Sequence, residues 1–213
     1  MTVLDIYTKL KNPPNLQEHM LRVTKVALFI YDHWNGTPID KDLLLRVTLL
    51  HDVGNIVKFN MQKYPHFLGD EIKRVDYWID VQKEVKEKYG TDDHEVTGKM
   101  LSELKVNPII IQTVLDMSYW NAPIIAKSDN WILKILLYSD LRVSPTGIIP
   151  IKERLDDVHS RLEKYKERMD LYEEGLEIEN QIQQNVSCKL SDITNETTQA
   201  DENQFLALQI ETK

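Results

Sequence analysis

The chain of 213 residues contains a single cysteine, Cys188, so it cannot form an internal disulfide. Proteins without disulfides are typical of reducing compartments, and we therefore expect a cytosolic protein. The first residues lack a basic segment followed by a long apolar stretch, and no apolar run approaches the length of a membrane span. The sequence thus predicts neither a signal peptide nor association with a membrane.

Glycine and proline are also scarce, with 7 and 8 residues respectively, and long stretches contain neither. Because both residues interrupt helices, their scarcity favours a helical protein. Hydrophobic residues make up 42% and charged residues 28% of the chain, as is ordinary for a folded globular protein. The length suffices for one sizeable core.

Positive charge is in deficit: 26 lysines and arginines face 34 aspartates and glutamates, which gives a net charge of -8. Broad binding to nucleic acid or to an acidic membrane needs positive patches, so this balance argues against both. A small anionic substrate is not excluded, provided that a metal ion or local lysines and arginines offset the negative field.

Apolar residues at helical spacing, together with capping residues, predict helices over most of the chain. Five segments are clearest, at roughly residues 15–34, 41–55, 71–89, 91–104 and 129–143. The expected N-terminal caps are Asn15 with Glu18 as its capping-box partner, Asp40, Thr91 or Asp92, and Ser128, and the expected C-terminal cap is Gly90.

Beyond residue 150 the pattern changes to a heptad-like seam surrounded by charge. The seam consists of Ile151, Leu155, Val158, Leu162, Tyr165, Met169, Tyr172 and Leu176. It predicts one long charged helix, which packs on its own domain in the favoured interpretation or forms a homodimer contact in the alternative. We predict a domain of residues 1–175 and a polar C-terminal extension, 176–213, in which 205–210 returns as a short strand or helix.

Three predicted helices carry potential metal ligands on their apolar faces: His19, the adjacent His51 and Asp52, and Asp140. A carboxylate taken out of water is very costly unless it is paired, hydrogen-bonded or bound to a cation. Imidazole nitrogen with carboxylate oxygen suits a divalent ion such as Mn, Fe, Co, Ni or Zn. Four such ligands also leave positions open for water and substrate, as a catalytic site requires.

This arrangement resembles the HD superfamily of metal-dependent phosphohydrolases, whose pattern is a histidine, a downstream His-Asp pair and a distant aspartate. The matching residues are His19 in LQEHMLRV, His51 and Asp52 in LLHDVGN, and Asp140 in LLYSDLRV. The resemblance covers roughly residues 15–165. It implies an all-α helical bundle, a bound divalent metal and hydrolysis of a phosphate ester or anhydride, often in a nucleotide.

A bound metal ion lowers the pKa of its water and polarises a phosphoryl oxygen, so Asp52, as a ligand, is a candidate catalytic residue. His94 is the second, because it lies in the first turn of a predicted helix, where an anion is favoured. It could bind the substrate phosphate or protonate the leaving group. The candidate substrate-binding residues are Arg22, Asn55, Lys58 and Arg142. Asn55 and Lys58 share a face with His51 if that helix continues.

Some members of this superfamily bind two metals through additional histidines between the His-Asp pair and the last aspartate. Here only His66 and His94 lie in that interval, and Asn55 stands where many two-metal relatives have lysine. We therefore predict one metal. The alternative to an enzyme is a non-catalytic module that binds a nucleotide for regulation. A paired-iron oxygenase is a third hypothesis, against which the shortage of histidines argues.

Overall fold

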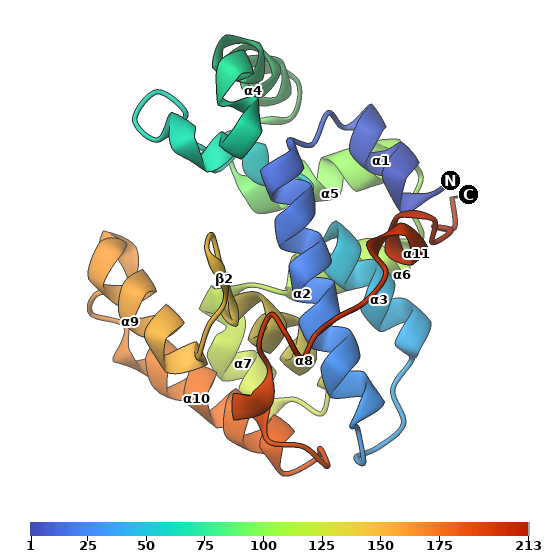
Figure 1. Ribbon diagram of the computed structural model, residues 1–213, viewed down its shortest axis with the longest axis vertical. Helices are drawn as coiled ribbons and strands as arrows, with labels where there is room; N and C mark the ends of the chain where they lie inside the picture. Colours follow the sequence, from blue (N-terminus) through green and yellow to red (C-terminus); the bar gives the residue numbers. More distant parts are fainter. Residues whose placement is uncertain (213) are drawn as a thin grey trace. The chain divides into compact units, whose positions relative to one another are not determined.

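A computed structural model describes residues 1–212 of the chain, and Figure 1 follows them from end to end. Within these residues, eleven α-helices and five short 3₁₀-helices accompany one two-stranded sheet. The predicted all-α fold is confirmed.

The α-helices are α1 (Val3–Lys9), α2 (Pro14–Asp32), α3 (Lys41–Leu50), α4 (Val75–Tyr89), α5 (Asp93–Glu103), α6 (Pro108–Asp116), α7 (Ala122–Lys127), α8 (Trp131–Leu141), α9 (Ile151–Arg161), α10 (Met169–Gln183) and α11 (Glu202–Leu206). The 3₁₀-helices are η1 (Asn55–Lys58), η2 (Pro65–Arg74), η3 (Tyr119–Asn121), η4 (Glu163–Tyr165) and η5 (Leu190–Asp192). The antiparallel strands are β1 (Val143–Ser144) and β2 (Gly147–Ile148).

The chain divides into two compact units that alternate along the sequence. Unit 1 contains Met1–Leu21, Leu49–Leu115 and the residues from Asp201 onward, and unit 2 contains Arg22–Thr48 and Asp116–Ala200. The boundary predicted between residues 175 and 176 falls inside α10, and the end of the predicted extension belongs to unit 1.

The two ends of the chain meet within unit 1, beside α1 and α11 (Figure 1). The Val3 amide donates to the Leu208 carbonyl at 3.1 Å, and Thr2 pairs with Gln209 in an isolated antiparallel bridge. Residues 205–210 therefore return to the body as predicted, partly as the end of α11 and partly as this bridge.

Two helix ends in unit 1 follow the predicted capping residues. Gly90 ends α4 with a φ of 109°, in the region that favours glycine. Asp92 begins α5, because its carboxylate accepts a hydrogen bond from the Glu95 amide at 3.0 Å. The helix predicted from residue 71 begins as α4 only at Val75, since η2 occupies the preceding residues. The prediction that Asn15 caps a helix with Glu18 as its capping-box partner is wrong, because α2 begins at Pro14 and already includes Asn15.

Unit 2 is built around α8, which is buried on nearly all sides and contacts α7, α9 and α10. The prediction that Ser128 caps this helix is wrong. The cap is Asn130, whose side-chain oxygen accepts a hydrogen bond from the Leu133 amide at 3.2 Å. The Ser128 hydroxyl accepts from the Asn130 amide, which precedes the helix.

The predicted long charged helix is also wrong, because the chain breaks after Arg161. Leu162 is extended, η4 follows, and α10 begins at Met169 and packs against α9. The break shifts the helical phase, so α10 buries Leu171, Gly175, Ile178 and Ile182 instead of the expected seam positions. The apolar residues of both helices pack within unit 2, and a homodimer contact stays a prediction.

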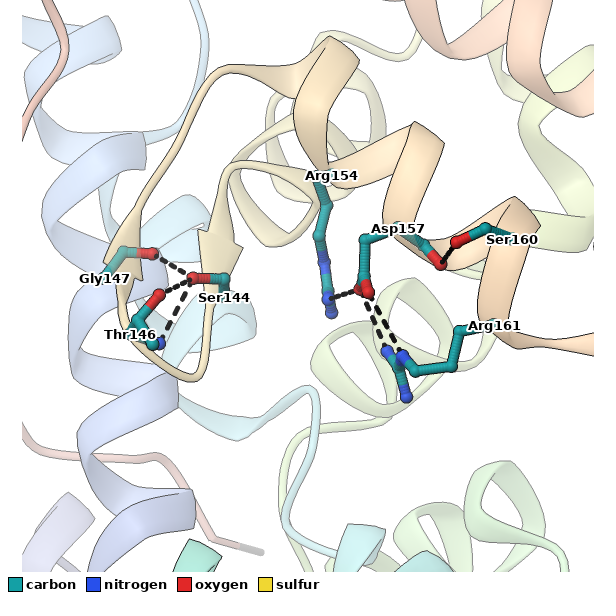
Figure 2. A network of polar contacts seen from close by, with 7 residues as sticks. All are labelled: Ser144, Thr146, Gly147, Arg154, Asp157, Ser160 and Arg161. Atoms are coloured by element: carbon teal, nitrogen blue, oxygen red, sulfur yellow. Dashed lines mark hydrogen bonds and ion pairs between the residues drawn. The ribbon is translucent and has the colours of Figure 1, made fainter.

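Polar contacts fix the β1–β2 hairpin and connect three side chains of α9 (Figure 2). The Ser144 hydroxyl donates to the Gly147 carbonyl at 3.0 Å, which closes the hairpin turn. On α9, Arg154 and Arg161 both donate to the Asp157 carboxylate at 3.1 Å. These guanidinium groups, Arg161 first, hold the pKa of Asp157 below its usual value.

Candidate metal centre

His51 and Asp52 lie in a turn and not on a helix, in contrast to the predicted helix over residues 41–55. Helix α3 begins at its predicted cap, where the Asp40 carboxylate accepts from the Leu43 amide at 3.0 Å, but it ends at Leu50. The turn then closes through the Asn55 amide, which donates to the Asp52 carbonyl at 2.9 Å, and the chain enters η1.

Three of the predicted ligands come together within unit 1. His19 Nε2 lies 3.4 Å from one carboxylate oxygen of Asp52, and His51 Nε2 lies 3.8 Å from the other. The His51 side chain is fully buried, whereas His19 and Asp52 keep 22% and 19% of their side chains exposed. The cluster is therefore closed on the protein side and reachable from solvent.

The donor atoms of this cluster suit a divalent transition metal ion. Each of the three residues offers one ligand atom, and these atoms lie within 4.8 Å of one another. Two atoms bound at about 2.1 Å to a common ion lie no more than about 4.2 Å apart. The distances from Asp52 to His19 and to His51, 3.4 and 3.8 Å, meet this condition without movement of the backbone. The residues present therefore fit the metal that the sequence pattern implies.

Two residues that the sequence did not single out hold the backbone on either side of the ligand turn. The Tyr7 hydroxyl donates to the Leu49 carbonyl at 2.6 Å, and the Asn12 amide donates to the Val53 carbonyl at 2.7 Å. Both bonds are buried, and burial raises the pKa of Tyr7, which keeps this donor protonated. Because these partners are more than forty positions away in the sequence, no local pattern could have revealed them.

Gly54 lets the ligand turn approach α5 more closely than any other residue would. Its amide donates to the Thr97 hydroxyl at 3.1 Å. A Cβ at this position would lie 2.6 Å from the Thr97 amide nitrogen and 2.9 Å from the Asp93 carbonyl oxygen. The first turns of α5 are thus packed directly against the segment that carries His51 and Asp52.

The remaining candidates of unit 1 lie on the two segments that meet here. Lys58, in η1, forms an ion pair with Asp93 in the first turn of α5, and about half of its side chain is exposed. His94 follows Asp93 in that first turn, as predicted, and is partly buried. Asn55 begins η1, so it shares no continuous α-helix with His51, contrary to the expected arrangement.

The other three predicted site residues belong to unit 2. Asp140 lies near the end of α8 and is partly buried, and Arg22 donates to the Ser144 carbonyl at 3.4 Å.

Arg142 is buried and makes four hydrogen bonds within its own unit. It donates to the Ile149, Leu190 and Ile193 carbonyls and to the Tyr138 hydroxyl. These contacts give it a structural role, and we do not retain it as a substrate-binding residue.

Among residues 1–212, none of the helices has the length and apolar character that a membrane span requires.

Comparison with known proteins supports the ligand pattern. A family model described as HD domain matches residues 16–127, a segment that includes His19, His51 and Asp52 and ends before Asp140. Searches of curated proteins and of solved structures returned no match.

Proposed function

Because this chain belongs to the HD-domain family, whose model covers more than half of it, we propose that it is a metal-dependent phosphohydrolase. The HD-domain family consists generally of metal-dependent hydrolases. The observation that carries the proposal is the cluster of His19, His51 and Asp52, whose donor atoms lie within 4.8 Å of one another. The proposed substrate is a small phosphomonoester or phosphoanhydride, with a nucleotide as the expected class.

The proposed ligands of one divalent ion (Mn, Fe, Co, Ni or Zn) are His19, His51, Asp52 and Asp140. The mixed nitrogen and oxygen donors support this choice of metals. Asp140 is assigned from the family's sequence pattern, in which a distant aspartate completes the set. The lone Cys188, which is not in a disulfide, supports a reducing compartment such as the cytosol.

When bound, the metal would supply an acidified water and would polarise a phosphoryl oxygen. Residues of the chain hold the centre, donate a proton and offset charge. The two histidines and the Asp52 carboxylate fix the centre, with Tyr7 and Asn12 holding its backbone. In the proposed reaction His94 would donate a proton to the leaving oxygen as its bond to phosphorus breaks, the proton of the attacking water would pass to solvent, and Lys58 would offset the phosphate's negative charge.

Metal-reconstituted protein is expected to release inorganic phosphate from members of a nucleotide panel. Release should require added Mn or Co and should stop when a chelator removes the ion, because the water is not acidified without it. A colorimetric phosphate assay measures this directly. Binding of a nucleotide with no phosphate release for any metal would instead support the regulatory module, and activity in an iron-free preparation would exclude the oxygenase.

Asp140→Asn should weaken metal binding by roughly 10–100-fold, the range typical when a partner of a metal site is altered. The amide keeps an oxygen donor but loses the negative charge, so partial affinity should remain. Competition titration with a chromophoric chelator measures the change. Asp129→Asn, at an exposed position of the same unit, is the matched control and should bind metal normally. Unchanged affinity in Asp140→Asn would remove this residue from the ligand set and leave the other three.

A further inference from the structure

A pocket of about 440 Å³ lies in unit 1, directly after the ligand turn in sequence. One wall is the segment 57–62, which starts five residues after Asp52, and the other is one face of α4. The volume falls within the range of about 300–1,000 Å³ that is usual for small-molecule sites.

The walls of this pocket are fixed to one another. Ile79, Gln82 and Lys86 are spaced by three and four residues, which places them on one face of α4. The Gln82 side-chain amide donates to the Ile56 carbonyl at 2.6 Å and to the Phe59 carbonyl at 2.8 Å. A single side chain therefore ties η1 and the residue after it to α4, and the pocket does not depend on ligand for its shape.

The pocket is positively charged, in a protein whose net charge is -8. Lys58 and Lys86 line it, and no aspartate or glutamate does. Lys58 already links η1 to α5 through Asp93. Lys86 is partly buried and forms no ion pair within residues 1–212, whereas Lys83, one turn earlier, is exposed and pairs with Glu87. A partly buried lysine beside amide side chains is a suitable contact for a phosphoryl group.

We propose that this pocket binds a second phosphoryl group of the substrate, one that is not cleaved, with Lys58 and Lys86 as its cationic contacts. This inference rests on the proposed function, and it narrows the substrate class to small molecules with two phosphoryl groups, such as nucleoside bisphosphates. Asn60 and Gln62 line the same pocket and offer amide donors to the phosphoryl oxygens, whereas the Gln82 amide is already used by the Ile56 and Phe59 carbonyls.

Lys86→Gln should weaken the binding of inorganic pyrophosphate about tenfold, because a charge-assisted contact is lost. The measurement is calorimetric titration of the full chain in the presence of a chelator, so that no metal contributes. Lys86→Arg keeps the charge and should bind within about threefold of the unaltered protein. Lys83→Gln removes the same charge from an exposed position of α4 that does not line the pocket and should bind as the unaltered protein does.

With metal restored, Lys86→Gln should lower kcat/KM about tenfold for a nucleoside bisphosphate and less than about twofold for the matching monophosphate. Equal losses for both substrates, or pyrophosphate binding that Lys86→Gln leaves unchanged, would overturn the pocket assignment. If pyrophosphate binding depends on Lys86 but no phosphate is ever released, the pocket stands and the proposed hydrolase activity fails.

Discussion

Asp52→Ala should abolish metal binding and reduce phosphate release at least about a thousandfold. The carboxylate lies 3.4 and 3.8 Å from the two histidines, and among the described residues of unit 1 it is the only negative ligand of the cluster. Without it the two imidazoles and the proposed ligand Asp140 remain, and the centre has lost one ligand and half of its negative charge, so it holds a divalent ion poorly. Since the ion provides several kcal/mol of transition-state stabilisation, its loss corresponds to about a thousandfold in rate.

Metal analysis of purified protein by atomic emission, together with the phosphate assay, measures both consequences. Asp80→Ala is the control, because Asp80 is an exposed aspartate on α4 in the same unit. Circular dichroism shows whether the Asp52 variant keeps its helices, which separates loss of the ligand from loss of the fold. Equal metal content in Asp52→Ala and in the unaltered protein would refute the site.

The features that were predictable from the sequence depend on neighbouring residues. Gly90 and Asp92 mark helix ends because a cap acts through atoms three or four residues away, and the structure confirms both. The ligand pattern was visible because ionisable residues stood at positions where helical periodicity required apolar ones. His19, His51 and Asp52 do cluster, although the last two lie in a turn and not on the predicted helix.

The features that were missed depend on distant partners. Arg142 lies two residues after the proposed ligand Asp140. Its guanidinium nevertheless donates to the Leu190 and Ile193 carbonyls, about fifty positions away in the sequence. The heptad-like seam failed for a related reason. A spacing pattern predicts phase only while the helix continues, and the extended Leu162 interrupts it. Packing of the ligand turn on α5 is a third contact that no local pattern records.

That packing leads to the second large effect, which we expect from Gly54→Ala. The backbone of Gly54, with φ of -90° and ψ of -7°, is available to alanine, so the change should cause no local strain. The added methyl group would nevertheless lie 2.6 Å from the Thr97 amide nitrogen and 2.9 Å from the Asp93 carbonyl oxygen. Both atoms belong to the backbone of α5 and cannot rotate away. The ligand turn and α5 must therefore separate, at a cost of about 1–3 kcal/mol.

Separation would also displace His51 and Asp52 from His19, so metal affinity should fall at least about tenfold. Gly98→Ala, within α5 itself, is the matched control. Its added methyl group would meet only the Leu115 side chain, at 3.1 Å, and alanine favours a helix over glycine by about 1 kcal/mol. Chemical denaturation of the metal-free proteins and metal titration test both variants. If Gly54→Ala instead matches Gly98→Ala in stability and in metal affinity, the positions of His51 and Asp52 do not depend on the close approach to α5. In that case the packing on this helix does not position His94 relative to the metal centre.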